Sequence, residues 1–437
     1  MTGSPAGLGA HRPDPSTPGL LAGAASATLD LDGVLPVEGF ATVLDPLEVR
    51  VLLLDDRRRV ALAVVDMTSL STPLATELRG VVAEAGALAV HDVVIVASHT
   101  FSAPHVRDGL PPGEESDRND RLREALREAL RRSTQDAVAG LRPGRIVVRT
   151  GRCDVGVNRD VATAAGVWLG SDESGPSDPT VTACVVQDLS GAPVAVIVGY
   201  AVQPGVLADS WLADGTRVVS ADLAGAAVRH VEDRLPGAVA MYLVGAAADQ
   251  APRETAVVAT VDRDGTWRAA DRGEAAHPDV AEQGRRLGEE VVRLAAQVPV
   301  RAGDGSRGPV VLLRDQVEVL GRDAAPREEL RPARSAVWRS TGPTSVPIAA
   351  LRLGDLALAC LAPEVTVGTG VDVVARSSAP VTAVVTMADG AAKYLADRVS
   401  FERVTYEAQS SRFMPGAAEL VADGLVRLVA RAFDVAG

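Results

Sequence analysis

Four apolar runs of the sequence are each followed closely by a side chain able to bind or catalyse: His99, Gln203, Asp249 and Glu364. Short runs of apolar, β-branched residues are typical of strands buried on both faces. In open α/β sheets, ligands bind beyond the carboxyl ends of the strands. Any one of these residues could simply satisfy loop backbone groups. The four together predict a shared site for acid–base chemistry or metal ligation.

Those strand ends need a scaffold, and the rest of the chain predicts strands interleaved with helices. Strands are predicted at 47–55, 60–66, 93–98, 145–150, 180–188, 193–202, 238–247, 309–314, 346–362 and 380–388. Helices are predicted at 72–89, 118–140, 220–234, 279–298 and 416–433. Because 47–66 and 346–361 also read as hairpins, the expected fold class is α/β, with mixed β-sheets and flanking helices.

The segments between these elements predict loops and a tail, without a domain boundary. Polar stretches at 108–118, 170–179 and 253–278 are predicted loops, and long loops often cover active sites. Residues 1–18 are rich in Gly, Pro and Ser and are predicted to be a flexible tail. The composition is even from there on, so 19–437 is expected to form a single domain.

The bulk composition excludes several classes of protein. The 437 residues carry a net charge of −13 without a basic stripe, which argues against nucleic-acid binding. The three cysteines are dispersed, so neither a disulfide framework nor a zinc knuckle is expected. No signal peptide and no apolar run of about 18 residues is found, so no transmembrane segment is predicted. We therefore expect a bacterial cytoplasmic protein that acts on a small molecule.

Nine short motifs in sequence order resemble those of one family. They include SHTFSAPH (98–105), GYAVQPGV (199–206), GAAADQAPR (245–253), LAPEVTVGTG (361–370) and KYLADRVSFERVTYEAQSS (393–411), with further matches at 22–40, 155–160, 177–181 and 220–225. The chain resembles the N-terminal catalytic domain of the neutral/alkaline non-lysosomal ceramidases over nearly its whole length. The resemblance implies a ceramidase-like α/β domain, and the family's C-terminal immunoglobulin-like domain is expected to be absent.

The resemblance also implies a site. In the family, two histidines, a glutamate and a tyrosine hold a zinc ion, which activates water to hydrolyse the amide bond of ceramide. Carried over by position, His99, Glu364 and Tyr394 match metal ligands. Tyr406 and Arg159 match groups that contact the reacting amide.

Several positions depart from the family's motifs. The second histidine ligand is Gln203, the second histidine of the first motif is Phe101, and the serine of the GDxSP motif is Ala251. A carboxamide is a far poorer zinc ligand than an imidazole, and Phe101 removes a supporting imidazole. His105 is a conceivable substitute ligand. We therefore favour no cofactor, with Zn²⁺ as the alternative.

Without a metal, the predicted catalytic residues are Arg159, Asp249, Glu364, Tyr394 and Tyr406. The predicted substrate-binding residues are Phe101, Asn158, Gln203 and Ala251. Carboxylates in a partly dry site can act as general acids, and a guanidinium can stabilise an anion. The leading hypothesis is a ceramidase-like enzyme with metal-independent acid–base chemistry on a small molecule, of the kind found in bacterial specialised metabolism. A zinc-dependent hydrolase of N-acyl amides and a non-catalytic binding homologue are the alternatives, and the oligomeric state is left open.

Overall fold

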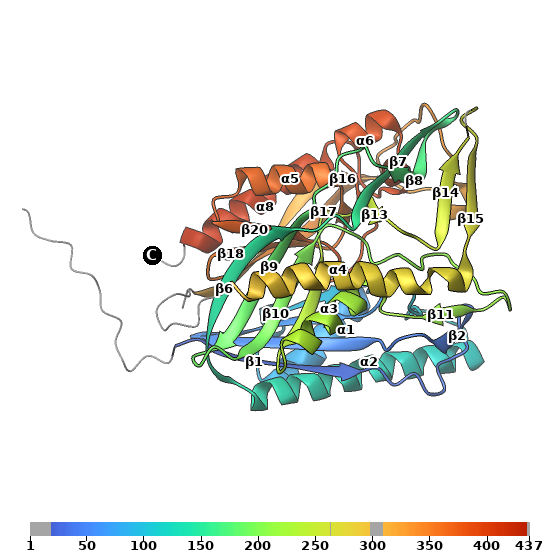
Figure 1. Cartoon of the computed structure of the whole chain (residues 1–437). Coiled ribbons are helices and arrows are strands. Elements are labelled where there is room, and N and C mark those ends of the chain that lie inside the picture. The colour runs from blue at the N-terminus through green and yellow to red at the C-terminus, as the bar shows by residue number, and fades with distance from the viewer. Residues whose placement is uncertain (1–18, 263, 298–308, 435–437) are drawn as a thin grey trace, which may run out of the picture.

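The larger of the two main sheets has mixed strand directions. The computed structural model describes residues 19–262, 264–297 and 309–434 (Figure 1), so the predicted tail 1–18 lies outside the described residues. Eight strands form this sheet in the order β12-β10-β9-β6-β1-β3-β4-β5. Their bounds are β1 Leu21–Thr28, β3 Glu48–Asp56, β4 Arg58–Val65, β5 Val93–Ala97, β6 Arg142–Arg152, β9 Thr180–Asp188, β10 Pro193–Tyr200 and β12 Val239–Val244. The outermost pairs, β12/β10 and β4/β5, are parallel, and the inner pairs are antiparallel.

A second, four-stranded sheet packs face to face on the first. Its order is β16-β17-β18-β20, with bounds Val310–Gly321, Gly342–Leu353, Leu356–Leu361 and Val381–Val385. Every residue of β18 is buried, because one face of this strand meets the large sheet and the other meets helices. Leu62 and Met241 of the large sheet share one core with Leu351 and Leu358 of the small sheet. The interleaved apolar faces are what hold the two sheets together.

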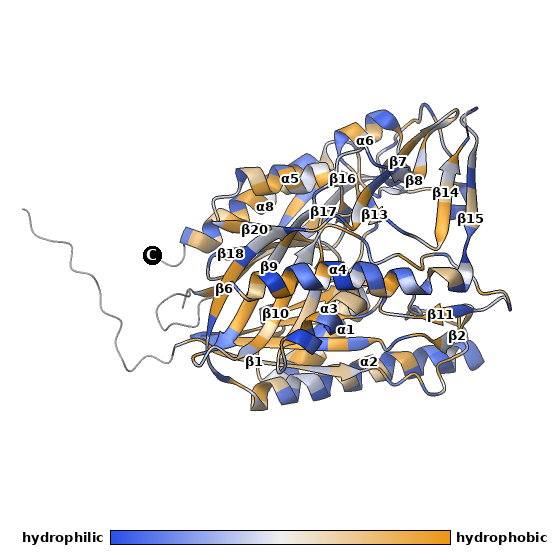
Figure 2. Cartoon of the chain, in the orientation of Figure 1, coloured by the Kyte–Doolittle hydropathy of each residue, from blue (hydrophilic) through white to orange (hydrophobic). Residues whose placement is uncertain are grey.

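Helices cover both outer faces and complete four layers (Figure 1). On the large sheet lie α1 Thr72–Gly86, α2 Glu114–Ala139, α3 Asp222–Arg234 and α4 His277–Ala295. On the small sheet lie α5 Val367–Arg376 and α8 Ala417–Asp434. Leu122, Leu126 and Leu130 recur every fourth residue and are buried, so α2 places an apolar stripe on the sheet and keeps its charges outward (Figure 2).

Short strands and helices lie at the end of the two-sheet sandwich that carries the predicted site. They are β2 Phe40–Val43 with β11 Arg217–Val219; β7 Gly156–Thr163 with β8 Gly166–Asp172 and β13 Gln250–Pro252; β14 Val257–Val261 with β15 Trp267–Asp271; and β19 Glu364–Val365 with β21 Tyr394–Leu395. Two short helices, α6 Arg398–Arg403 and α7 Tyr406–Ser410, follow β21, and 3₁₀ turns lie at Val90–Asp92, Gly273–Ala276 and Arg327–Glu329.

The predicted α/β class with mixed sheets is confirmed, as are the two hairpins β3/β4 and β17/β18. The predicted loop at 253–278 is wrong, because it contains the β14/β15 hairpin, whose two strands are short and mostly exposed. The predicted loop 108–118 ends early, since the acidic residues from Glu114 form the first turn of α2. Helix α5 was not predicted. Among the described residues, none of the helices is both long and apolar enough to span a bilayer.

Candidate active site

Three of the four predicted strand ends meet directly. His99 follows β5, Gln203 lies just beyond β10, and Glu364 begins β19, and all three side chains are buried. The His99 Nε2 atom lies 3.2 Å from Glu364 Oε2, and Gln203 Nε2 donates a hydrogen bond of 2.7 Å to that same oxygen. Residues far apart in sequence therefore share one carboxylate oxygen.

The His99 ring is held in a fixed direction by its own backbone and by a neighbouring carbonyl. Its φ of 69° is in the left-handed region, which turns the chain sharply as it leaves β5. Its Nδ1 atom lies 2.6 Å from the carbonyl oxygen of Thr68, which aims Nε2 at Glu364. Burial alone would lower the pKa of the imidazole, but the Glu364 carboxylate outweighs it and raises that pKa above 6.5. His99 is thus suited to be an imidazolium beside a carboxylate.

The guanidinium of Arg159, in β7, connects this pair to the rest of the site. Nη1 donates to Gln203 Oε1 at 3.1 Å and Nη2 to the Tyr394 hydroxyl at 3.1 Å. Nε and Nη2 both donate to Glu407 Oε1, at 3.0 and 2.7 Å. Burial opposes the charge, but the Tyr394 and Glu407 side chains raise the pKa of Arg159 well above its ordinary value. We call the connected set of His99, Arg159, Gln203, Glu364, Tyr394 and Glu407 the polar cluster.

The two tyrosines come from adjacent short elements. Tyr394 is placed by the parallel pairing of β21 with β19, where it lies directly opposite Glu364. Tyr406 begins α7, a helix capped by the Thr405 side chain, which accepts a hydrogen bond from the backbone of Ala408. The two rings meet edge to face with centroids 5.9 Å apart, and Tyr406 packs in the same way on Trp168 at 5.5 Å. Arg159 lies 5.6 and 5.8 Å from the two tyrosine rings.

Asp249 and Asn158 support the polar cluster from behind. Asp249 Oδ1 accepts the Val367 backbone N–H at the start of α5 at 2.8 Å, and Oδ2 accepts from Asn158 Nδ2 at 3.3 Å. The Asp249 carbonyl accepts the backbone N–H of Arg159 at 2.9 Å. Burial raises the pKa of Asp249 to about 6. These bonds fix β7 and α5 in place, and the catalytic role predicted for Asp249 and the substrate contact predicted for Asn158 stay predictions.

The remaining predicted positions lie at the edge of the site or away from it. The half-buried Phe101 ring packs against the His99 ring at 4.7 Å, and Ala251 lies in β13 opposite Val157. His105 does not reach the polar cluster as a substitute ligand, because its Nδ1 atom is 2.7 Å from Glu38 and its side chain is 43% exposed.

Two buried carboxylates were missed from the predicted site. Glu407 is fully buried and is the ion-pair partner of Arg159. Asp160, the next residue along β7, is buried with Arg403 at 3.4 Å. Burial, together with the nearby Glu407 and Asp249 carboxylates, raises the pKa of Asp160 to about 8. The Tyr-Glu pair at 406–407 was the one signal in the sequence, whereas nothing distinguished Asp160 from a surface acid.

The three residues matched to metal ligands each contact another polar side chain of the cluster. Glu364 Oε2 is already taken by an amide N–H donor and faces an imidazole, and the hydroxyl of Tyr394 accepts from a guanidinium. A catalytic zinc needs about three good donors free to turn toward it, and it repels a neighbouring cation. Among the described residues, no group of three or more His, Cys, Asp or Glu side chains is arranged as a metal site.

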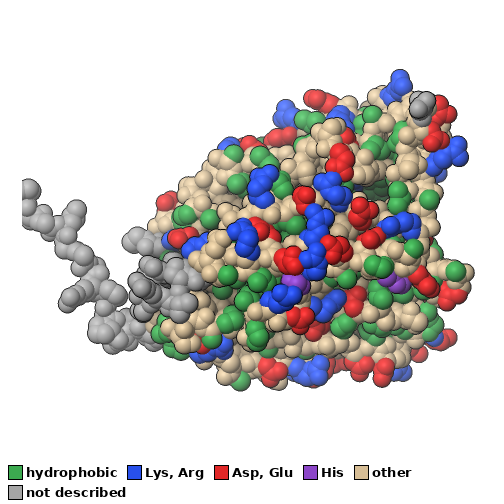
Figure 3. Space-filling view, in the orientation of Figure 1, with side chains coloured by type: hydrophobic (Ala, Val, Ile, Leu, Met, Phe, Trp, Pro, Cys, Tyr) green, Lys and Arg blue, Asp and Glu red, His purple; other side chains and the backbone are tan. Residues whose placement is uncertain are grey.

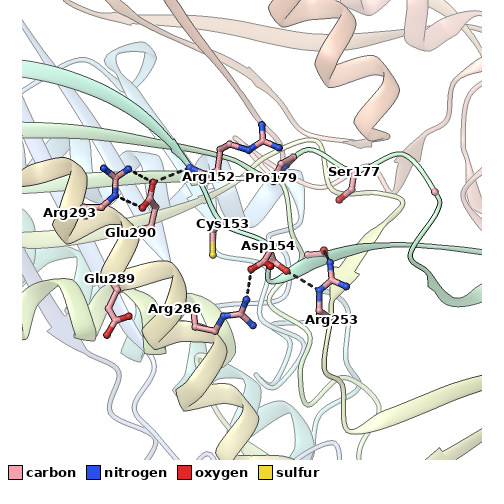
Figure 4. A pocket seen from close by; sticks show the side chains of 12 residues that line it. Arg152, Cys153, Asp154, Ser177, Pro179, Arg253, Arg286, Glu289, Glu290 and Arg293 are labelled. Atoms are coloured by element: carbon pink, nitrogen blue, oxygen red, sulfur yellow. Dashed lines mark hydrogen bonds and ion pairs between the residues drawn. The ribbon is translucent and has the colours of Figure 1, made fainter.

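A large hollow of the surface lies away from the polar cluster (Figure 4). It is an open cavity of about 820 Å³, and it lies between the start of β7 and helix α4. It is lined by Arg152, Cys153, Asp154, Gly156, Gly175, Ser177, Pro179, Arg253, Arg286, Glu289, Glu290 and Arg293, and we call it the arginine cavity. Arg286 pairs with Asp154, and Arg293 with Glu290 at 2.7 Å. Acidic and basic side chains alternate along this face (Figure 3), which leaves little net charge for a ligand.

Comparisons with known proteins place the fold. No family model matches the chain, and no curated protein matches it. A crystal structure of neutral ceramidase from Pseudomonas aeruginosa is similar, with a TM-score of 0.71 at 17% identity over 95% of this chain and 75% of the other. A structure described as ceramidase complexed with C2 matches with a TM-score of 0.70 at 16% identity, over 95% and 76% of the two chains. The chain has a ceramidase-like fold.

Proposed function

We propose that this protein is a hydrolase related to the ceramidases that cleaves an acyl bond of a small molecule by metal-independent acid–base chemistry. The observation that carries the proposal is the polar cluster, in which hydrogen bonds connect a base through Gln203 to a cation, and that cation to a phenol. The ceramidase-like fold supports the hydrolase class by analogy, and the polar cluster carries the argument for the activity.

Glu364 is the group best placed to accept a proton. Both of its close polar contacts, from His99 and Gln203, are made to Oε2, and among the described residues no hydrogen bond is made to Oε1. Oε1 is therefore the atom that would take a proton from an attacking water. The imidazole of His99 lies 3.2 Å from Oε2 of the same carboxylate, and the pair together would pass the proton on to the leaving group.

Arg159 and Tyr394 are the groups best placed to stabilise the oxygen that becomes negative during attack. The guanidinium and the hydroxyl are 3.1 Å apart, so an acyl oxygen beside them would meet one cation and one O–H donor. Such preorganised donors stabilise an oxyanion because they need no rearrangement as the charge forms. Glu407 holds the guanidinium in that place by accepting from Nε and from Nη2, the nitrogen that also donates to Tyr394.

The test compares turnover of N-acyl amides, esters and lactones by the wild type, Glu364→Gln and Tyr406→Phe. We expect Glu364→Gln to lose at least about 100-fold in kcat, because general base catalysis contributes that much. Tyr406→Phe should lose less, since Tyr406 contacts Tyr394 only through its ring. Circular dichroism and melting curves would show that both variants fold. Equal turnover in all three proteins would remove the polar cluster from the mechanism.

The zinc-dependent amidohydrolase is the second candidate, because His99, Glu364 and Tyr394 do lie in one cluster. Metal analysis of the purified protein, before and after dialysis against a chelator, separates the two. We expect less than about 0.1 zinc per chain and unchanged turnover after chelation. One zinc per chain, with activity lost on chelation and restored by Zn²⁺, would replace the proposed mechanism by the second.

A further inference from the structure

Arg217 is a half-buried cation that lies beside two aromatic rings close to the polar cluster. It begins β11, and its guanidinium carbon lies 4.3 Å from the centre of the Phe40 ring and 5.7 Å from that of Trp211. Its Nη2 atom donates to the carbonyl oxygen of Phe101 at 3.2 Å. Since the Phe101 ring packs on His99, only one residue separates this guanidinium from the polar cluster.

The charge of Arg217 has no anionic partner among the described residues. None of their carboxylates approaches its guanidinium within 4.0 Å, and the buried Nε atom has no hydrogen-bond partner. The acids nearest to it are engaged elsewhere: Asp209 pairs with Arg327, and Glu38 with His105 and Arg107. Burial lowers the pKa of Arg217, yet a guanidinium remains charged at neutral pH.

Two other stacked arginines show how the fold ordinarily satisfies such a group. Arg322 lies over Trp338 at 4.6 Å and donates to the carbonyls of Ala408 and Gln409 in α7. Arg352 lies over Phe433 at 4.1 Å and donates to carbonyls at the end of α8 and to Gly354. Each has at least two carbonyl partners, whereas Arg217 has one. Of these three stacked arginines, Arg217 is therefore the one with the most N–H donors available to a ligand.

One of the two rings beside Arg217 is exposed at the surface. The indole of Trp211 is 50% exposed, and its backbone N–H is anchored by Asp271 at 2.7 Å. Arg327, whose side chain is mostly exposed and pairs with Asp209, lies near enough to Arg217 for the two guanidinium groups to repel each other. A ligand beside Arg217 and Trp211 would meet one unpaired cation and an aromatic face while it reached toward His99.

We propose that Arg217 and Trp211 form a subsite for the carboxylate of an acyl substrate, so that the protein selects N-acyl amino acids and similar acidic amphiphiles over neutral amides. This inference rests on the proposed function and names the substrate class for the same site. The net charge of −13 repels anions at long range, so selection of an anion needs a local cation whose charge is not cancelled. Arg217 provides that cation.

Binding of a matched pair of probes tests the subsite without reference to turnover. N-hexanoylglycine and its neutral amide, N-hexanoylglycinamide, differ in charge but hardly in shape. By calorimetry at low salt, we expect the wild type to bind the acid about tenfold more tightly, as one charge-assisted bond provides. Arg217→Gln should bind both probes alike, and Arg217→Lys should keep part of the preference. Arg352→Gln, which removes a stacked arginine far from the site, should behave as the wild type.

The outcomes separate the subsite from the proposed function. A preference for the acid that Arg217→Gln abolishes, without hydrolysis of either probe or of longer acyl chains, would retain the subsite and reject the hydrolase. Hydrolysis of both probes at equal kcat/KM would reject the subsite and retain the hydrolase. Equal or undetectable binding of the two probes by the wild type, or a preference that survives in Arg217→Gln, would overturn the inference.

Discussion

The polar cluster and the arginine cavity contain the same kinds of charged side chain, but the cluster is buried and the cavity is exposed to solvent. In the cluster, the ion pair of Arg159 and Glu407 is 12% and 0% exposed, whereas the Arg286–Asp154 pair of the cavity is 37% and 74% exposed. Water screens the charges of the cavity, so each ion pair there contributes little to the free energy of unfolding, and its residues can be substituted. In the cluster, each buried charge is stabilised by the side chain paired with it. The arginine cavity is therefore the weaker candidate for chemistry.

The strongest test of this contrast removes one arginine from each region. Arg159→Met leaves Glu407 buried without a cation, so we expect a loss of about 3–5 kcal/mol in the free energy of unfolding, and loss of turnover. Arg286→Met should change stability by less than about 0.5 kcal/mol. Urea unfolding of both variants measures the difference. Similar losses in the two variants would show that burial does not separate the regions.

A second test uses the pH dependence of stability. The pKa of Asp160 is about 8 in the folded protein and near 3.8 when unfolded, so the folded state binds the proton more tightly. Stability should therefore fall as pH rises from about 4 to about 8 and remain low above that range. Asp160→Asn carries no such charge, and we expect it to exceed the wild type by at least about 1 kcal/mol at pH 9.

The matched control for that test lies in the arginine cavity. Asp154→Asn removes a mostly exposed carboxylate and should follow the pH curve of the wild type closely. A wild-type curve that rises between pH 4 and 8, or an Asp160→Asn curve parallel to it, would show that the Asp160 carboxyl is not held protonated by its neighbours. Chemical unfolding at half-unit steps of pH resolves either outcome.

The smallest effect is expected for a pair on the surface of α4. Arg293 contacts Glu290 three residues earlier, at 2.7 Å, and its side chain is half exposed. Arg293→Ala should change the unfolding free energy by less than about 0.5 kcal/mol, and less still in 1 M salt, because exposed pairs are screened. Melting curves at two salt concentrations measure this. A loss of several kcal/mol would mean that the arginine cavity is a cooperative network.

The sequence predicted those parts of the molecule that depend on local pattern. The apolar runs before His99, Gln203 and Glu364 marked buried strands, and a polar residue just after each run marked its end. The structure brings these three residues together. Helix α2 followed from the spacing of its leucines, although its acidic first turn read as a loop.

What the sequence could not reveal are contacts between distant segments. Arg159 and Glu407 are 248 residues apart, and the Asp249 carboxylate is bound by a backbone N–H 118 residues later. No local rule distinguishes a carboxylate that caps a helix from one that faces a substrate. The same holds for Arg217, whose significance lies in the partner it lacks.

The pairing of β19 with β21 is only two residues long, yet it sets Glu364 across from Tyr394. Side chains along a strand alternate between faces, so a shift of one residue would turn the carboxylate or the phenol away from Arg159. The segment 366–393, with α5 and β20, connects the two strands. Insertions and deletions in this segment are tolerable during evolution only where Glu364 still pairs with Tyr394. A two-residue ladder therefore limits how a much longer stretch of chain can change.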